Sequence, residues 1–181
     1  MTTQISTLAN GCFWCSEAIF KRLKGVKSVL PGYSGGIVEN PSYEQVCAGK
    51  TRHAESIQIE FEPTVIPYEK ILDVFWHTHD PTTLNRQGND VGTQYRSAIF
   101  YHDQKQKEIA EKSKRDLEKA GVYKNPIVTE ITPFKNFYVA EDYHKNYYEK
   151  HQDAPYCNFV INPKVHKLIR KYGNDLENRY K

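Results

Sequence analysis

Segments with strand periodicity alternate along this chain with segments of helical periodicity, and this alternation limits the folds that the chain can adopt. Residues 54–61 show the strand pattern most clearly, with Ile57, Ile59 and Phe61 on one face and polar residues on the other. Residues 104–120 show the helical pattern, with favourable charged pairs on the surface and a glycine at the end. We expect strands at 3–8, 26–33, 54–61, 97–101 and 127–132, and helices at 13–24, 42–48, 104–120 and 140–151, with two more opening at Pro67 and at Asn162-Pro163.

Nothing in the sequence divides these segments into separate units. The 181 residues contain no internal repeat, low-complexity stretch or linker, so we expect one mixed α+β domain over 1–181. The glycines of 32–36 predict a tight turn or a close backbone approach after the second strand, and Gly173 is placed to end the last helix.

The 25 basic and 22 acidic residues leave a net charge of +3, which does not require an acidic partner.

The N-terminal residues lack the basic start and the long apolar run of a signal peptide. No segment has the roughly 20 apolar residues that span a bilayer. We therefore expect a cytoplasmic protein without a membrane partner. Cysteines in that compartment are more often catalytic or redox-active than structural, so the four cysteines at positions 12, 15, 47 and 157 are candidate reactive groups.

The segment 11–17 places a cysteine between an expected strand and an expected helix. Backbone N–H groups at a helix start favour negative charge, so we expect this position to lower the pKa of Cys12 and to supply a nucleophilic thiolate. Phe13 and Trp14, exposed or half-exposed beside it, would form an apolar cradle. Cys15, one helical turn further on, is either the partner of Cys12 in a Cys-x-x-Cys pair or an inward-packing core residue.

The other two cysteines carry weaker signals. Cys47 has no nearby base, and we expect it to be a buried structural residue. Cys157 precedes an apolar run, and it is either a buried thiol or a redox partner late in the chain. One Cys-x-x-Cys pair supplies only half of a zinc site, and His77 and His79 do not complete it, so we expect no metal.

Glu55 stands at the mouth of the strand 54–61 and by parity points inward with the apolar residues. A carboxyl group in apolar surroundings has a raised pKa and stays protonated near neutrality, as a general acid must. The alternative is an end-of-strand carboxylate paired with Arg52 or Lys50. The polar loop 86–96 is either part of a site or a solvated connector.

Several short motifs follow one another in an order that is highly specific as a series: Gly11-Cys12-Phe13-Trp14, Gly32-Tyr33-Ser34-Gly35-Gly36, Asn40-Pro41-Ser42-Tyr43, His53-Ala54-Glu55, His79-Asp80-Pro81-Thr82, Arg86-Gln87-Gly88-Asn89-Asp90, Gly92-Thr93-Gln94-Tyr95-Arg96-Ser97 and Ala140-Glu141-Asp142-Tyr143-His144. Together they resemble the family of peptide methionine sulfoxide reductase A, whose members reduce the S epimer of methionine sulfoxide. The resemblance runs from residue 11 to about residue 150.

The resemblance implies an α+β two-layer sandwich with a mixed, mainly antiparallel sheet, flanking helices and a ferredoxin-like core. It implies no cofactor and no metal. Carried over by position, it implies roles for seven side chains: Cys12 as nucleophile, Glu55 as the acid that protonates the sulfoxide oxygen, Tyr43 and Tyr95 as hydroxyls that hold this oxygen, Phe13 and Trp14 as the pocket for the S-methyl group, and Asp90 as a further active-site residue.

The implied reaction releases methionine and leaves a sulfenic acid on Cys12. A second thiol then forms a disulfide with Cys12, and thioredoxin restores the dithiol. Many members have glycine where this chain has Cys15, and they resolve through a cysteine in a glycine-rich C-terminus. Cys15 and Cys157 are therefore both candidate resolving cysteines, with Cys15 slightly favoured. We expect a monomer that repairs oxidised proteins and accepts methionine sulfoxide both free and in peptides.

Two other functions fit parts of the sequence. A thioredoxin-like disulfide oxidoreductase would use the Cys-x-x-Cys pair but would not need Glu55 or the two tyrosines. A nucleic-acid-binding module could use the basic face of the last helix, but this face is more simply a solvated surface opposite the apolar one, and we expect no nucleic-acid partner. Its basic residues are Lys164, Lys167, Arg170 and Lys171.

Overall fold

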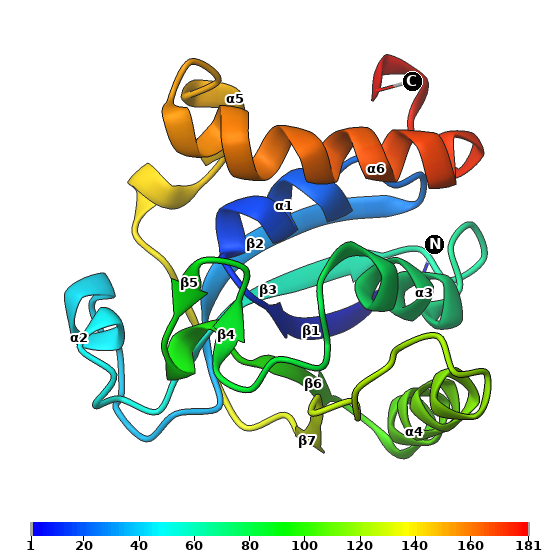
Figure 1. The fold of residues 1–181 in the computed structure, drawn as a ribbon, viewed down its shortest axis with the longest axis horizontal. Coiled ribbons are helices and arrows are strands. Elements are labelled where there is room, and N and C mark those ends of the chain that lie inside the picture. The colour runs from blue at the N-terminus through cyan, green and yellow to red at the C-terminus, as the bar shows by residue number, and fades with distance from the viewer. Residues whose placement is uncertain (1, 181) are drawn as a thin grey trace.

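The computed structural model describes residues 2–180, which form a curled six-stranded sheet with flanking helices (Figure 1). The strand order is β7-β6-β1-β3-β2-β8, and every neighbouring pair is antiparallel except β6 and β7. A separate two-stranded hairpin, β4 and β5, arises from the polar loop. The strands are β1 (Gln4–Asn10), β2 (Val26–Ser34), β3 (Ala54–Phe61), β4 (Arg86–Gln87), β5 (Asp90–Val91), β6 (Ser97–Tyr101), β7 (Glu130–Pro133) and β8 (Phe137–Val139).

Helices accompany the sheet, so the expected α+β class is confirmed. Short 3-10 turns lie at Thr93–Tyr95, Asp142–His144, Gly173–Asp175 and Asn178–Tyr180, and a π-helical turn at Cys157–Ile161 leads into the last helix. The helices are α1 (Phe13–Phe20), α2 (Tyr43–Cys47), α3 (Tyr68–Thr78), α4 (Gln104–Lys119), α5 (Tyr147–Lys150) and α6 (Asn162–Tyr172).

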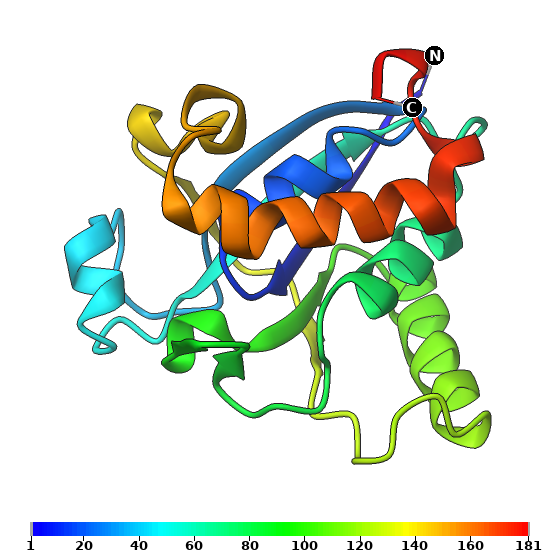
Figure 2. The same ribbon diagram turned by 45° about the horizontal axis from the view of Figure 1, so that its top comes forward.

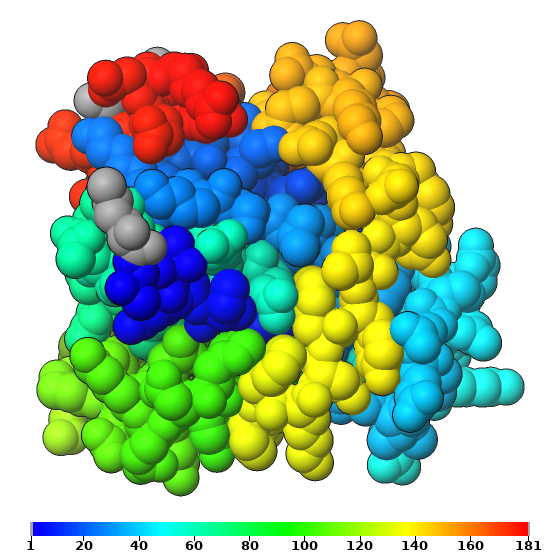
Figure 3. All heavy atoms as spheres, turned by 180° about the vertical axis from the view of Figure 1, so that it is seen from behind, coloured from blue at the N-terminus to red at the C-terminus, as the bar shows by residue number. Residues whose placement is uncertain are grey.

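The main core lies between the sheet and the helices α1, α3 and α6, which gather on one face of it (Figure 2). Ile57, Ile59 and Phe61 are fully buried there, as their alternation along the strand predicts. The opposite face shows the N-terminal end of β1, in dark blue, and the segment 125–140, in yellow (Figure 3). Within residues 2–180, no helix combines the length and the apolar character needed to cross a bilayer.

The predicted helix over 140–151 is wrong. The chain there forms the turn Asp142–His144 and then the separate short helix α5. Asn146 lies between them in the left-handed region, with φ of 55°, and this conformation cannot continue a right-handed helix. Asparagine tolerates the left-handed conformation better than most residues do. The interruption of the helix is therefore a local effect of having asparagine at this position.

Other element boundaries shift for identifiable reasons. Helix α1 stops at Phe20 rather than at residue 24, because Leu23 leaves it to bridge Leu176. The strand predicted from residue 127 begins at Glu130, because pairing with β6 starts at Ala98 and Glu130. Gly173 does not adopt the left-handed conformation expected of it, since its φ is −53° and the chain continues into another turn.

Candidate active site

Cys12 lies at the junction between β1 and α1, where the sequence predicts it. Gly11 makes this junction possible, because its φ is 95° and a Cβ there would lie only 2.6 Å from the Cγ of Gln87. The Ser16 hydroxyl donates a 2.6 Å hydrogen bond to Asn10 Oδ1 and so ties the helix to the end of the strand. Cys12 is the N-cap residue of α1.

Glu55 points inward from the start of β3, as parity predicts, and exposes only 2% of its surface. The backbone N–H of Phe13, the first residue of α1, donates a 3.0 Å hydrogen bond to its Oε2. Burial raises the pKa of Glu55 to about 8, with smaller contributions from the charges of Asp90 and Cys15. The carboxyl group is therefore mostly protonated at neutral pH. The alternative pairing with Arg52 or Lys50 does not occur.

The expected lowering of the Cys12 pKa is wrong, because burial raises it well above the ordinary thiol value. Contact with Cys15 and the charge of Glu55 raise it further, while contact with Tyr156 lowers it. Cys12 is only 5% exposed, and the first helical N–H is already bonded to Glu55. Desolvation thus outweighs the favourable field of an eight-residue helix.

Cys15 carries the opposite shift, although it too is buried. Contact with the Cys12 thiol, followed by the charge and contact of Lys164, lowers its pKa to about 7 against the opposing effect of burial. The two thiols are in contact, so the negative charge of the pair is favoured on Cys15 rather than on Cys12. Lys164, which the sequence places on a solvated basic face, is half-buried.

Tyr43 and Tyr95 line the same site from α2 and from the turn Thr93–Tyr95. Burial raises the pKa of both hydroxyls, and the nearby charge of Glu55 raises it further. Both therefore remain protonated at neutral pH and can donate hydrogen bonds.

Phe13 and Trp14 form an aromatic wall, but Phe13 is fully buried rather than exposed. The Trp14 ring stacks on Tyr147 with centroids 3.6 Å apart and an interplanar angle of 4°. Its Nε1–H donates a 2.9 Å hydrogen bond to His144 Nδ1. These two contacts fix the orientation of the indole.

Asp90 connects the polar loop to the site. Gly88, with φ of 60°, turns the β4–β5 hairpin that carries Asp90. Asp90 Oδ2 accepts a 2.7 Å hydrogen bond from the Tyr156 hydroxyl, which also contacts Cys12. The loop 86–96 therefore belongs to the site rather than being a solvated connector, and Tyr156 covers the sulfur.

Sequence reasoning missed the supporting roles of Glu141, His144 and Tyr156. Glu141 accepts 2.8 Å hydrogen bonds from the Tyr33 hydroxyl and from the Tyr43 N–H, so it fixes the start of α2. His144 is fully buried beneath Trp14. The motif 140–144 was visible in the sequence, but nothing in it assigned these partners.

The two remaining cysteines differ sharply. Cys157 is fully buried in a cluster with Cys12 and Cys15, which places a third thiol at the site. Cys47 is exposed, so its predicted burial is wrong. The helix that carries it, α2, has five residues and buries only Val46. Within residues 2–180, no group of three or more His, Cys, Asp or Glu side chains is placed to hold a metal ion.

A thiol pair, a protonated buried carboxyl group and two phenols meet at one helix N-terminus in a curled α+β sheet. This arrangement defines a thiol-dependent oxidoreductase. The family model described as peptide methionine sulfoxide reductase matches residues 4–177. The chain therefore belongs to the family of peptide methionine sulfoxide reductases and is an enzyme of the MsrA type. The thioredoxin-like alternative is not supported.

Relatives and solved structures agree with this assignment. The chain is 56% identical over 174 residues to the peptide methionine sulfoxide reductase MsrA of Saccharolobus solfataricus, with 96% of this chain and 97% of the relative covered. Reduced Mxr1 from Saccharomyces cerevisiae superposes with a TM-score of 0.78 at 37% identity, covering 86% of this chain and 89% of Mxr1. Mxr1 in complex with Trx2 matches with a TM-score of 0.55 at 28% identity, covering 80% and 84%.

Proposed function

We propose that this protein reduces the S epimer of methionine sulfoxide, free and in peptides and proteins, to methionine, and so repairs oxidised proteins in the cytoplasm. It does so as a monomer, through one reductase domain over 1–181, without metal, cofactor or nucleic acid. The observation that carries the proposal is the meeting of the Cys12 thiol and the protonated Glu55 carboxyl group at the start of α1.

The chemistry requires both groups. A sulfoxide sulfur is a poor electrophile until its oxygen is protonated. Glu55 gives a proton to this oxygen, while the hydroxyls of Tyr43 and Tyr95 donate hydrogen bonds to it. Cys12 attacks the sulfoxide sulfur and forms a sulfur–sulfur bond with it. The protonated oxygen then passes from the substrate sulfur to the Cys12 sulfur. The sulfur–oxygen bond of the substrate and the new sulfur–sulfur bond both break, so methionine leaves and Cys12 carries a sulfenic acid. The proton lost by the Cys12 thiol returns to Glu55, so the step is balanced.

The aromatic wall supplies the pocket for the substrate methyl group. Phe13 and Trp14 form its apolar surface, and Tyr147 and His144 hold the indole in place. Asp90 orients the loop at the site and holds the Tyr156 hydroxyl. Because Tyr156 covers Cys12, a substrate reaches the sulfur when this side chain moves aside.

Cys15 is the first resolving cysteine in this proposal, and Cys157 is the second candidate. Contact between the Cys15 and Cys12 thiols and the pKa of about 7 at Cys15 support this order. Burial raises the pKa of Cys157, which makes it the poorer nucleophile at neutral pH. Thioredoxin then reduces the disulfide, in keeping with the complex of the related Mxr1 with Trx2.

We also propose that β1, β2, β3 and β6 form a ferredoxin-like core within a two-layer sandwich. These strands lie in the order β6-β1-β3-β2 with antiparallel neighbours. Helix α1 connects β1 to β2, and α3 lies between β3 and β6 in the chain. This is the β-α-β-β-α-β succession of such folds.

Turnover of each purified sulfoxide epimer with dithiothreitol tests the proposed reaction. We expect methionine to form from the S epimer and no detectable methionine from the R epimer, because only one arrangement puts the methyl group on the aromatic wall and the oxygen on Glu55. Methionine release is measured by chromatography. Reduction of the R epimer alone would refute the assignment.

Mapping of the disulfide after a single turnover tests the resolving step. We expect wild type and Cys157→Ser to form a Cys12–Cys15 bridge, and Cys15→Ser to lose it, as read by mass spectrometry of digests under alkylating conditions. A Cys12–Cys157 bridge in the wild type would reverse the order. A wild-type bridge from Cys12 to neither Cys15 nor Cys157 would exclude both candidates.

A further inference from the structure

Glu17 is a buried carboxyl group that the proposed reaction does not use. It lies on α1, exposes only 3% of its surface and forms no ion pair within residues 2–180. Burial of a carboxyl group is unfavourable unless hydrogen bonds replace its contacts with water. Here the backbone N–H of Asn146 donates to both carboxyl oxygens, at 3.0 Å to Oε1 and 2.9 Å to Oε2. The hydrogen bonds of this group therefore reach a segment 129 residues further along the chain.

Asn146 joins the turn Asp142–His144 to α5. Its φ of 55° lies in the left-handed region, which is costly for a residue with a side chain unless the surroundings hold it there. Helix α1 holds it twice, because Lys21, one turn after Glu17, donates a 2.6 Å hydrogen bond from Nζ to the Asn146 side-chain oxygen. Lys21 also pairs with Glu149 of α5 at 3.1 Å. The backbone and the side chain of Asn146 are thus both fixed to α1.

The residues close to Asn146 on either side are those that hold the indole of Trp14. His144, two residues before it, accepts the 2.9 Å hydrogen bond from Trp14 Nε1–H. Tyr147, directly after it, stacks on the indole with ring centroids 3.6 Å apart. Trp14 precedes Glu17 by three residues, so both side chains leave α1 on the same side of the helix. The helix that carries the indole therefore also carries the carboxyl group that fixes the segment bracing it.

We propose that Glu17 is a positioning residue for the pocket that takes the substrate methyl group. Its carboxyl group fixes Asn146, and the fixed segment holds the indole of Trp14 in one orientation. An aromatic ring that is already held in place loses no further freedom when a substrate binds, which lowers the cost of binding. This inference rests on the proposed function, and it gives a role to a buried group that takes no part in proton transfer or in the attack by Cys12.

Loss of the carboxyl group affects the indole without displacing the reacting groups. The Asn146 N–H would lose its buried acceptor, and an unsatisfied buried donor is costly, so the segment would loosen. The start of α1 would keep its own ties, because Ser16 remains bonded to the end of β1 and Glu55 remains bonded to the first N–H of the helix. The change therefore weakens substrate binding and leaves the chemical step intact.

Three variants test the proposal. Glu17→Met removes both acceptor oxygens at nearly constant side-chain length, and Glu17→Gln is the rescue, because it keeps one of them. Glu62→Met is the matched control. Glu62 is also a buried carboxyl group, with 6% of its surface exposed, but it follows the end of β3 and pairs with Lys27 at 2.8 Å.

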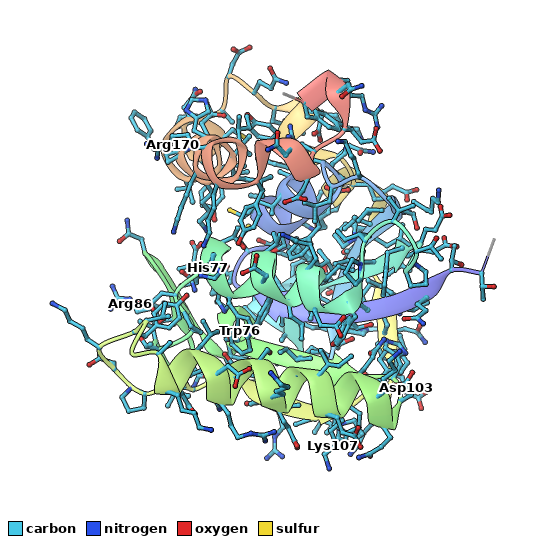
Figure 4. All side chains as sticks on the ribbon, turned by 90° about the vertical axis from the view of Figure 1, so that its right-hand side faces the viewer. Trp76, His77, Arg86, Asp103, Lys107 and Arg170 are labelled. Carbon is cyan, nitrogen blue, oxygen red and sulfur yellow. The ribbon has the colours of Figure 1, made fainter. Side chains whose placement is uncertain are left out.

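The NMR signals of the indole N–H groups report the orientation of Trp14 without any turnover. The chain contains two tryptophans, and Trp14→Phe identifies the signal that belongs to Trp14. Trp76 is the internal reference, because it lies on α3 beside α4, where its Nε1–H donates a 3.0 Å hydrogen bond to Ser113 (Figure 4). In Glu17→Met the Trp14 signal is expected to shift or broaden, while the Trp76 signal stays in place. The rescue and the control should keep both wild-type signals.

Rapid-quench kinetics of the first turnover test the consequence for the substrate. Each reduced enzyme is mixed with increasing concentrations of the S-sulfoxide, and methionine is measured by chromatography. In Glu17→Met the half-saturating concentration is expected to rise about fourfold, the factor for one methyl group that loses its apolar contact. The maximal rate is expected to stay within about twofold of the wild type. Glu17→Gln and Glu62→Met should match the wild type in both quantities.

Wild-type behaviour of a folded Glu17→Met in either measurement would overturn the role of Glu17 alone. A fall in the maximal rate in place of a loss of affinity would do the same, because it would show an effect on the reacting groups or on the fold. Changes in Glu17→Gln equal to those in Glu17→Met would overturn the hydrogen bond as the cause.

Hydrogen exchange of the wild type decides the matter if Glu17→Met does not fold. Protection of the Asn146 amide supports the anchor, and exchange as fast as in an unstructured peptide would overturn it. A wild type that forms no methionine from the S-sulfoxide would overturn the proposed function, and the substrate role of Glu17 with it.

Discussion

Replacing Cys12 by serine is expected to abolish reduction of the S-sulfoxide, with a loss of turnover of more than about 1000-fold. A serine hydroxyl group is a far weaker nucleophile than sulfur at neutral pH. It also cannot accept the sulfoxide oxygen as a stable sulfenic acid, because the product would be a peroxide. The measurement is methionine release with dithiothreitol as reductant, so that the recycling step does not limit the comparison.

The matched control is Cys47→Ser, which removes the exposed thiol on α2. A serine there can still reach the Tyr43 hydroxyl, so activity close to that of the wild type is expected. Thermal unfolding of Cys12→Ser should resemble that of the wild type, since the change is small in volume. Turnover by Cys12→Ser within tenfold of the wild type would show that another group attacks the sulfoxide.

The elements that the sequence predicted correctly depend on local patterns. The alternation in β3 is a period-two signal, and it placed Glu55 on the buried face together with Ile57 and Phe61. The position of Cys12 at a strand–helix junction followed in the same way from its neighbours in the chain. Resemblance to a family then supplied the residue roles, which no periodicity could have provided.

The errors concern contacts between distant segments. The burial of Cys12 depends on Tyr156, more than a hundred residues away, which the Asp90 carboxylate holds over the sulfur. The lowered pKa of Cys15 depends on the Cys12 thiol and on the charge of Lys164, which lies on the last helix. An amphipathic pattern shows which face of a helix is apolar, but it does not show which neighbour a residue at the edge of that face will contact.

Glu55→Gln is expected to lower turnover roughly 100- to 1000-fold while the protein still folds. Glutamine keeps the shape of the side chain, and its oxygen can accept the hydrogen bond from the Phe13 N–H, but it cannot give a proton to the sulfoxide oxygen. The wild type should lose activity as the pH rises through about 8, the pKa of Glu55, because only the protonated carboxyl group is an acid. Glu55→Gln should lack this descending limb, and a rate profile identical to that of the wild type would exclude Glu55 as the proton donor.

Stability provides a second readout that does not depend on turnover. The pKa of Glu55 is raised from its ordinary value of 4.5 to about 8 in the folded protein. The folded state therefore binds more protons than the unfolded state between these values, and stability falls as the pH rises through this window. Glu55→Gln lacks this titrating group, so its free energy of unfolding should not show this fall with pH. The free energy of unfolding of Glu55→Gln minus that of the wild type should therefore rise by a few kcal/mol from pH 4 to pH 9. Urea unfolding at both pH values measures this difference, and equal changes in the two proteins would show that Glu55 is not held neutral by burial.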